Sequence, residues 1–487
     1  MASVYSPEGV RPLNVTNTDN RLVASSVRVA IEPILGQLVT MDQKGFISGR
    51  SMLSNILDVE EAMALATFRG IRSLAVFFDF SAAFPSIEHA LMFEYFDALE
   101  WPQWLMRIIR ILYQGNSCDI SMGPVAFFGF SITRGIRQGC PLSPLLFAVA
   151  SELILRRLSR SVRDNTARAW ADDIAMVIPR GLEVLPCIAS IFLEFGLISG
   201  LLLSIGKTVI APLFPIDLVE FRSLLTAAVP SWGAMQVSFA AKYLGLFVGP
   251  DKGARSWTAP IRKYLDRAQQ WGRLGLGLHM SIRAYSTYIL SVLMFVGQLE
   301  PLPHSFDGFE ATACRRLFPG PYRWIVPEVL KQLKAMHFPV ELRDATTFSV
   351  AARSRVLRTE NLQQGGLRVR ERHRAIQRAM NQCADENYVW AVQWIPNLSF
   401  AHLVSADDLV QNRLDETRSA EQSVPILQQW MDGRTGDDDT NEPPSAKRRR
   451  GPSWQKAAMN LLRKPSLIEP LKHLRKRLDK LGSNDAL

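Results

Sequence analysis

The chain has 487 residues, 47% of them hydrophobic and 21% charged, which is enough apolar material for a core of two or three packed units. Lysine and arginine outnumber aspartate and glutamate by 56 to 46, and the resulting charge of +10 favours a polyanionic partner such as a nucleic acid. The five cysteines are widely spaced without a CxxC pair, which argues against a structural zinc site and favours a reducing compartment.

A membrane span is not expected. The longest apolar run without charges lies between Arg283 and Glu300, is shorter than the roughly 20 residues that cross a bilayer, and includes polar side chains. The run predicts a buried helix, and we expect a soluble, intracellular protein that contacts no membrane.

The first half of the chain predicts a domain that mixes helices with a sheet. Residues 11 to about 250 alternate helical patterns with short runs rich in Val, Ile and Phe. Within them, the segment SLAVFFD predicts a buried strand that ends in Asp79. Such a strand holds its terminal carboxylate rigidly at the edge of a sheet, but Asp is also a good cap for a following helix. Both roles are open for Asp79 on its own segment.

The segment RGIRQGCPLSPLLF predicts a glycine-containing loop that leads into a helix. Gly135 and Gly139 allow a backbone to approach a ligand closely, and Ser143 followed by Pro144 is a favourable helix start with Ser143 as the cap. Such a loop can place Gln138 and backbone N–H groups against a nucleotide. The alternative is an ordinary loop before a core helix.

Two adjacent carboxylates, Asp172 and Asp173, lie between apolar flanks in the segment WADDIAMVIP. This pattern predicts a β-hairpin with the acids in its turn. Acidic turns are common, but turns of this kind usually contain Gly or Asn, and this one contains neither. Because adjacent carboxylates repel each other, the pair favours a compensating cation such as Mg²⁺, which takes oxygen ligands.

The second half of the chain is mostly helical from about 255 to 425, with breaks at prolines. Residues 431–453 combine Gly, Pro, an acidic run and a basic run, which is typical of a linker. Residues 454–487 predict a strongly basic helix with an apolar stripe.

Two further basic regions are candidates for specific roles. One lies in the predicted linker and fits a nuclear localisation signal as well as it fits a solvated charge run; its residues are Lys447, Arg448, Arg449 and Arg450. We therefore expect the protein in the cytoplasm, the nucleus or both. The arginines between Arg353 and Arg378 are a candidate RNA surface.

The strand end, the glycine loop and the acidic hairpin, in this order, resemble the central motifs of reverse transcriptases, especially those of non-LTR retrotransposons. RGIRQGCPLSPLLF is the most specific match, and FFDFSAAFPSI and WADD resemble the flanking metal-binding motifs. RPLNVTNTDNRLVASSV and DQKGFISGRSMLSNIL resemble fingers segments, SGLLLSIGKT resembles the segment with a functional lysine, and AKYLG resembles the primer-grip hairpin. Seven matches in the right order leave little room for chance.

The resemblance implies an α+β fold of the right-hand polymerase type. The implied parts are partial fingers at 1–72, a catalytic palm at 73–250, a helical thumb or connector at 251–430, a disordered linker at 431–453 and a basic C-terminal helix at 454–487. The implied activity is that of an RNA-directed DNA polymerase with two Mg²⁺ ions, for which Mn²⁺ is an alternative. The implied partners are an RNA template, a DNA primer and deoxynucleoside triphosphates, while protein partners are unknown.

The resemblance also implies roles for individual residues. The metal ligands would be Asp79, Asp172 and Asp173, together with the backbone carbonyl of Phe80. The steric gate that excludes a 2′-hydroxyl would be Phe84, and the lysine that protonates pyrophosphate would be Lys207. The other nucleotide contacts would be Arg11, Gln138 and Gly139. The primer end would be positioned by Tyr243, Leu244 and Gly245.

Several alternatives stay open. Phe84 could be an ordinary core aromatic, and Lys207 a solvated surface lysine. Trp170 replaces the Tyr or Phe that usually precedes ADD, and the match begins at the second fingers segment, so the chain could be a fragment that is not active alone. The rival functions are a catalytically impaired remnant that binds RNA and an RNA-dependent RNA polymerase, although ADD and Phe84 argue against the latter.

Overall fold

The computed structural model describes residues 17–69, 72–137, 139–320, 325–363, 368–383 and 386–414. Several expectations therefore lie outside the described residues. These are the roles of Arg11 and Gln138, the linker, the basic signal at 447–450 and the C-terminal helix.

A five-stranded sheet with the strand order β4–β5–β1–β6–β7 lies at the centre of the region predicted as the palm. Its strands are β1 (Leu74–Phe78), β4 (Thr166–Trp170), β5 (Asp173–Ile178), β6 (Val209–Pro212) and β7 (Gln236–Val237). β1 runs antiparallel to both of its neighbours, and all of its residues are buried. Both faces of this strand are therefore covered, which explains why the strand is apolar throughout.

Successive residues of β1 point to opposite faces of the sheet, and two hydrophobic cores result. Val76 and Phe78 belong to the first core, whereas Ala75 and Phe77 belong to the second. The helices of the first core are α1 (Thr18–Leu38), α3 (Ala83–Ser86), α4 (His89–Ala98), α5 (Gln103–Tyr113), α6 (Ser143–Ser161), α7 (Gly181–Ser199) and α8 (Leu218–Ala228).

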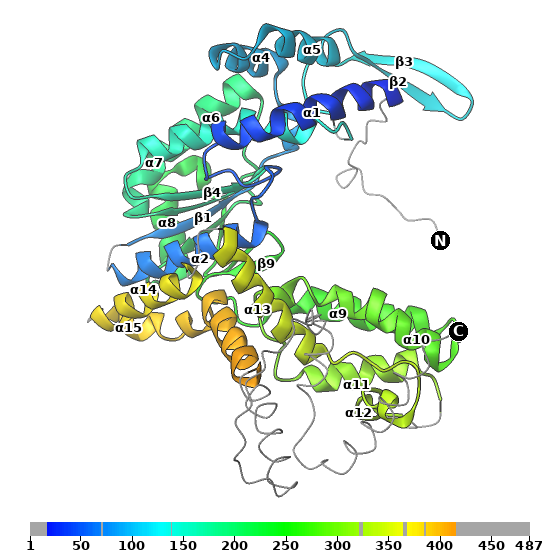
Figure 1. The fold of residues 1–487 in the computed structure, drawn as a ribbon. Coiled ribbons are helices and arrows are strands. Elements are labelled where there is room, and N and C mark those ends of the chain that lie inside the picture. The colour runs from blue at the N-terminus through cyan, green and yellow to red at the C-terminus, as the bar shows by residue number, and fades with distance from the viewer. Residues whose placement is uncertain are drawn as a thin grey trace, which may run out of the picture.

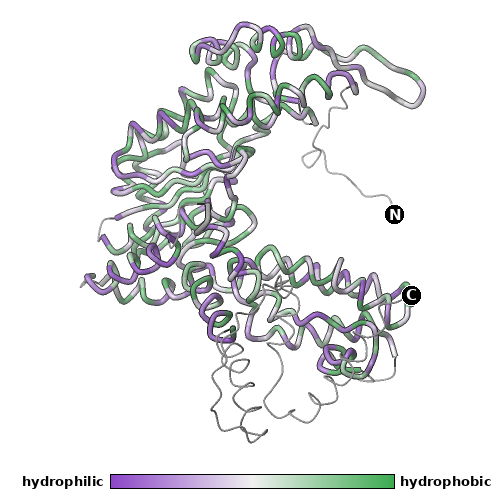
Figure 2. The backbone as a smooth tube through the Cα atoms, in the orientation of Figure 1, coloured by the Kyte–Doolittle hydropathy of each residue, from purple (hydrophilic) through white to green (hydrophobic). Residues whose placement is uncertain are grey.

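The second core covers the other face of the sheet with segments that are far apart in the sequence. They are α2 (Met52–Phe68), the hairpin of β8 (Ala241–Tyr243) and β9 (Leu246–Val248), and the helices α13 (Ala345–Gln363), α14 (Arg368–Gln382) and α15 (Glu386–Ala391). A last helix over 399–414 follows them. Figure 2 shows that α14 is largely hydrophilic, so its place beside α2 depends on charge as well as on apolar contacts.

A separate helical unit forms the third core. It contains α9 (Arg255–Gly272), α10 (Gly277–Ala284), α11 (Phe306–Leu317) and α12 (Pro327–Leu330). Figure 1 shows this unit extending from one end of the palm, while α4, α5 and the hairpin of β2 (Ser117–Met122) and β3 (Val125–Ser131) extend from the other end. The region expected at 251–430 thus contains two parts, because α13–α15 return to the palm.

Two apolar segments bear on membrane insertion, and both contribute side chains to a core. The run between Arg283 and Glu300 is buried as predicted, but it is not one regular α-helix. It contains a π-helix at Tyr285–Ile289 and 3₁₀ helices at Leu290–Val292 and Val296–Gln298, with side chains in the third core. Among the described helices, α7 is the one that is long and apolar enough to cross a membrane by length and composition. Its buried residues contribute to the first core, whereas Leu193, Leu197 and Ile198 are exposed.

The arginines between Arg353 and Arg378 do not all form the expected RNA surface. The buried Arg353 donates to the carbonyl oxygen of Glu300 over 3.0 Å, and Arg358 and Arg370 both pair with Asp407. Arg372 pairs with Asp58 over 2.7 Å. The interpretation as an RNA surface is wrong for these four side chains, because contacts within the protein already use them.

Candidate active site

Asp79 follows the last residue of β1 and is half-buried. Its backbone N–H donates to Oγ1 of Thr208 over 3.3 Å, and its carbonyl oxygen accepts the N–H of Ser204 over 2.7 Å. The next residue, Phe80, forms an antiparallel bridge with Leu203. The backbone that carries the Asp79 carboxylate is therefore held between β1 and the 203–208 turn.

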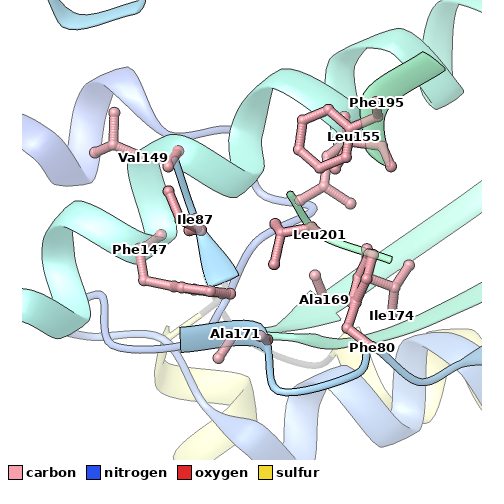
Figure 3. Close-up of a cluster of buried hydrophobic side chains, with 14 of the residues drawn as sticks. Phe80, Ile87, Phe147, Val149, Leu155, Ala169, Ala171, Ile174, Phe195 and Leu201 are labelled. Carbon is pink, nitrogen blue, oxygen red and sulfur yellow. The ribbon is translucent and has the colours of Figure 1, made fainter. Parts of the chain in front are cut away.

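Capping is not the role of Asp79. The helix that follows is α3, whose N-cap is Ala82 and which has no side-chain cap. The side chain of Phe80 lies in the first core with Ile174 and Leu201, as Figure 3 shows. Because that side chain turns into the core, only the backbone of Phe80 remains for a contact in the site.

The predicted acidic hairpin is confirmed, with one adjustment. Trp170 at the end of β4 pairs with Asp173 at the start of β5, so the two-residue turn consists of Ala171 and Asp172. Asp172 is half-buried and Asp173 is exposed. Ala171 has a φ of 58°, in the left-handed region that Gly or Asn usually occupies in such turns. Because the turn contains neither Gly nor Asn, Ala171 has to adopt this strained backbone conformation.

The register of the sheet brings the two acidic segments together. Phe78 pairs with Ile174, so the next residues, Asp79 and Asp173, lie opposite each other at the end of the sheet. Residues opposite each other on antiparallel strands have Cβ atoms about 5 Å apart. Asp172 precedes Asp173 in the turn, so the three carboxylates predicted as metal ligands belong to the same end of the sheet.

An ion-pair network behind the hairpin is a feature that sequence analysis missed. Arg168 on β4 pairs with Asp42 over 2.8 Å and with Asp58 over 2.7 Å, and Asp58 also binds the buried Lys44 over 2.6 Å. Burial alone would raise the pKa of Asp58, but Lys44, Arg168 and Arg372 hold it well below its usual value. The segment DQKGF contains two of these residues, and its alternating charges were the available signal.

The predicted primer-grip segment is a second hairpin, in which Leu244 and Gly245 form the turn with φ values of 47° and 89°. A Cβ atom on Gly245 would lie 2.8 Å from the ring of Phe295, so glycine is needed there for space as well as for conformation. Leu244 is half-buried, whereas Gly245 is exposed.

Tyr243 is buried behind the acidic hairpin of β4 and β5. Its hydroxyl accepts a hydrogen bond from Nδ2 of Asn55 over 2.9 Å and donates to the carbonyl oxygen of Arg168 over 3.3 Å. Burial, and after it the carboxylate of Asp173, raises the pKa of Tyr243 well above its usual value. The Tyr243 side chain therefore connects the two hairpins, whereas the turn at Leu244 and Gly245 lies at the surface.

Phe84, the predicted gate, lies in α3 and is half-buried. Its ring stacks on Phe147 with a centroid distance of 4.3 Å, and the ring of Phe46 meets it edge-on at 6.1 Å. The carbonyl oxygen of Phe84 accepts the N–H of Ile136 over 2.7 Å, which attaches the glycine loop to α3. In that loop Gly139 is exposed with a φ of 105°.

The structure leaves both interpretations of Lys207 open and excludes the cap role of Ser143. Lys207 is exposed in the 203–208 turn, and its backbone N–H donates to the Ser204 carbonyl oxygen over 3.0 Å, next to the contact that Ser204 makes with Asp79. Ser143 is not the helix cap that we expected, because α6 is preceded by Leu142 and has no side-chain cap. The Ser143 hydroxyl instead forms a 2.9 Å hydrogen bond with the hydroxyl of Tyr113.

The donor set at the end of the sheet is suited to a hard divalent cation, because carboxylate and carbonyl oxygens are the ligands that such ions prefer. Among the described residues, no group of three or more His, Cys, Asp or Glu side chains is arranged to hold a metal ion. Mg²⁺ sites in nucleotide enzymes usually combine one or two carboxylates with substrate phosphates and water. The residues present fit such a site when a nucleotide supplies the other ligands.

Sequence comparison decides the family. A family model described as "Reverse transcriptase (RNA-dependent DNA polymerase)" matches residues 5–248, half of the chain. The chain is a member of the reverse transcriptase family. The resemblance of its central motifs is confirmed, and members of this family use divalent metal ions.

Relatives of this reverse transcriptase come from mobile elements. It is 24% identical over 176 residues to the transposon TX1 uncharacterized 149 kDa protein of Xenopus laevis, covering 34% of this chain and 14% of that protein. It is 26% identical over 212 residues to the retrovirus-related Pol polyprotein from the type-2 retrotransposable element R2DM of Drosophila melanogaster, covering 41% and 19%. The matches thus span less than a fifth of the length of either relative.

Solved structures with detectable similarity include two telomerases. Telomerase from Candida albicans, in complex with the TWJ fragment of telomeric RNA, has a TM-score of 0.30 and 13% identity, covering 78% of this chain and 56% of that one. Apo telomerase from Candida tropicalis has a TM-score of 0.36 and 11% identity, covering 77% and 61%.

Proposed function

We propose that this reverse transcriptase adds deoxynucleotides to the 3′ end of a primer on an RNA template. The observation that carries the proposal is the register that sets Asp79 opposite Asp173, with Asp172 in the adjoining turn. Three carboxylates at the ends of two hydrogen-bonded strands would give this edge of the sheet a negative charge, which suits divalent cations that bring a triphosphate with them.

In the proposed reaction, the primer 3′-oxygen attacks the α-phosphorus of the incoming nucleotide, and the bond to pyrophosphate breaks. When bound, two divalent ions would favour ionisation of the primer hydroxyl and stabilise charge on the leaving pyrophosphate. Asp79, Asp172 and Asp173, with the Phe80 carbonyl oxygen, would hold them. Lys207, exposed on the turn beside Asp79, would donate the proton that pyrophosphate takes up.

The proposed ion is Mg²⁺, with Mn²⁺ as an alternative, because the donors are all oxygen atoms. The exposed part of the Phe84 ring would lie under the sugar and exclude a 2′-hydroxyl, and the turn at Leu244 and Gly245 would support the primer end. Gly139 would bring backbone N–H groups to the nucleotide, since it is exposed in a loop attached to α3.

The direct test replaces Asp172 with Asn in a primer-extension assay on an RNA template. We expect extension to fall at least ~100-fold, because the variant lacks one of the charges that would hold the ions. Asp164→Asn is the matched control, since Asp164 is exposed in the loop before β4 and has a φ of 56°, which Asn tolerates. Equal extension by the wild type and Asp172→Asn would show that Asp172 has no such role.

The same assay separates polymerisation from RNA binding alone. A wild-type protein that binds RNA with an affinity that falls linearly with salt on logarithmic axes, but extends no primer in Mg²⁺ or Mn²⁺, would be an impaired remnant. Preferential incorporation of ribonucleotides would instead indicate an RNA-dependent RNA polymerase.

A further inference from the structure

We infer that Gln43 is a positioning residue that fixes the turn carrying Asp172. The inference rests on the proposed function, because it concerns how a proposed metal ligand is held. Gln43 lies between α1 and α2, far from β4 and β5 in the sequence, and its side chain is fully buried. The four hydrogen bonds of its side-chain amide go to Ala171, Ser151 and Gly45, so its effect on Asp172 would be indirect.

The side-chain amide of Gln43 binds both backbone groups of Ala171. Its Oε1 accepts the N–H of Ala171 over 2.9 Å, and its Nε2 donates to the carbonyl oxygen of Ala171 over 3.1 Å. The amide thus replaces the backbone partner that a further strand would supply to the turn. Because Ala171 directly precedes Asp172, these two bonds fix the peptide from which the Asp172 side chain extends.

The other two hydrogen bonds of the amide fix its own orientation. Nε2 also donates to Oγ of Ser151 on α6 over 3.0 Å, and Oε1 also accepts the N–H of Gly45 over 2.8 Å. Each polar atom of the Gln43 amide therefore has two partners inside a buried site, where an unpaired polar group would be costly. Such a fully satisfied amide has one orientation.

The conformation of Ala171 explains why the turn needs this support. A non-glycine residue with a φ of 58° is strained, and strained residues persist only where their surroundings hold them in place. Without the Gln43 amide, the turn could relax, and Asp172 would move with it. Even a small shift of the Asp172 carboxylate matters, because reacting groups must be held within a fraction of an ångström.

Gln43 can do this because its own loop is fixed. The guanidinium of Arg50 donates to four carbonyl oxygens of the segment 36–43, including that of Gln43 over 2.5 Å. The N–H of Lys44 donates to the carbonyl oxygen of Ala169 over 2.9 Å, which joins the loop to β4. Gly45 then lies so close to the turn that a Cβ atom there would be 2.3 Å from the backbone N of Ala171.

The test compares Gln43→Met, which keeps the approximate size but removes the amide, with Gln298→Met. Gln298 is a half-buried glutamine in the helical unit whose amide donates one hydrogen bond within the protein, so it controls for the chemical change. We expect kcat for primer extension to fall about 10- to 100-fold in Gln43→Met. The KM for the nucleotide and the affinity for RNA should stay as in the wild type.

Metal binding provides a readout that does not depend on activity. The wild type and its variants are titrated with Mn²⁺ in the presence of a non-hydrolysable deoxynucleoside triphosphate and followed by electron paramagnetic resonance, with Asp172→Asn as the reference for loss of a ligand. We expect Gln43→Met to bind Mn²⁺ about 10-fold or more weakly, as is typical when the partner that orients a ligand is removed. A merely structural role would lower the melting temperature without this change.

The outcomes separate the inference from the proposed function. If the wild type extends primers and Gln43→Met is folded with unchanged kcat and Mn²⁺ affinity, the inference is wrong and the proposed function stands. If the wild type binds Mn²⁺ but extends no primer, weaker binding in Gln43→Met supports the inference while polymerisation fails. If Gln43→Met does not fold, Ser151→Ala is used in its place, since this substitution removes only one of the hydrogen bonds of the Gln43 amide. A folded Ser151→Ala with unchanged Mn²⁺ affinity would then overturn the inference.

Discussion

Phe84 illustrates how a side chain that packs in the core can also stay partly exposed at the proposed site. One face of its ring stacks on Phe147, and Phe46 meets its edge, yet the residue stays half-buried. The two readings of the sequence, a core aromatic and a gate, are therefore compatible. The packing holds the ring in one place, and a gate has to be rigid in order to exclude a hydroxyl group.

Replacement of Phe84 with Val should relax discrimination against ribonucleotides. The smaller side chain leaves space where a 2′-hydroxyl would lie, and a steric difference of this size usually changes selectivity about 10- to 200-fold. The measurement is kcat/KM for a deoxynucleotide and for the matching ribonucleotide. Phe84→Tyr keeps the bulk of the ring and is the matched control. Unchanged selectivity in Phe84→Val would leave Phe84 as a core residue only.

The positions of individual site residues could be predicted where the pattern of neighbouring residues determines the local structure. Asp79 could be predicted because an apolar run followed by an acid indicates the end of a strand. The hairpin could be predicted because acids between two apolar runs indicate a turn between strands. Gln43 was not found, because its partner Ala171 is 128 residues away and the contact is to a backbone group, which leaves no trace in the sequence. Ser143 was misjudged for a similar reason, since its hydroxyl meets Tyr113 across the core.

At the scale of elements, ion pairs as well as apolar packing join α14 to α2, and ion pairs join α2 to β4. Asp58 on α2 lies at the centre, paired with Lys44, Arg168 and Arg372. Arg372 is 314 residues from Asp58, so the sequence showed only an arginine-rich helix. The strands of the sheet could be predicted from their apolar runs, but the helices that return to cover the sheet could not. The apolar face of α14, with Val369 and Ile376 buried, does not show which part of the chain it packs on.

Asp58→Asn should destabilise the fold most at neutral pH. Removing one charge from a buried network typically costs about 3–5 kcal/mol, because its partners stay buried without compensation. The pKa of Asp58 is depressed in the folded state, so its contribution is present above the usual Asp pKa of about 3.9 and is lost as the pH falls further. The free energy of unfolding, measured with urea, should therefore be much lower in Asp58→Asn than in the wild type at pH 7. The difference should be smaller at pH 3.

Asp97→Asn is the matched control for this prediction. Asp97 pairs with Arg110 at the surface, where both side chains are 43% exposed, so its loss should cost less than about 1 kcal/mol. A difference between Asp58→Asn and the wild type that does not shrink below pH 4 would mean that the Asp58 charge is not what stabilises the junction.

At the scale of the whole molecule, the palm and the helical unit meet at one buried cation. Lys252, which follows β9, pairs with Glu60 on α2 over 2.8 Å and lies 3.6 Å from Glu300 at the end of the apolar run. Ser256 on α9 donates to Glu300 over 3.0 Å, and Glu60 also accepts the N–H of Ser399 over 2.9 Å. Four separate segments thus converge where α9–α12 leave the palm, which gives the helical unit a defined orientation.

Lys252→Met should loosen this junction without touching the acids that we propose as metal ligands. Burial alone would lower the pKa of Lys252, but Glu60 and Glu300 raise it, so the side chain is charged, and removing it leaves two buried carboxylates together. We expect a loss of about 3–5 kcal/mol, which further replacement with Glu60→Gln and Glu300→Gln partly restores. Hydrogen exchange of α2 and α9 measures the local effect, and Lys242→Met, on the exposed side of β8, is the control. If α9 exchanges no faster in Lys252→Met than in Lys242→Met, the apolar contacts alone hold the helical unit to the palm.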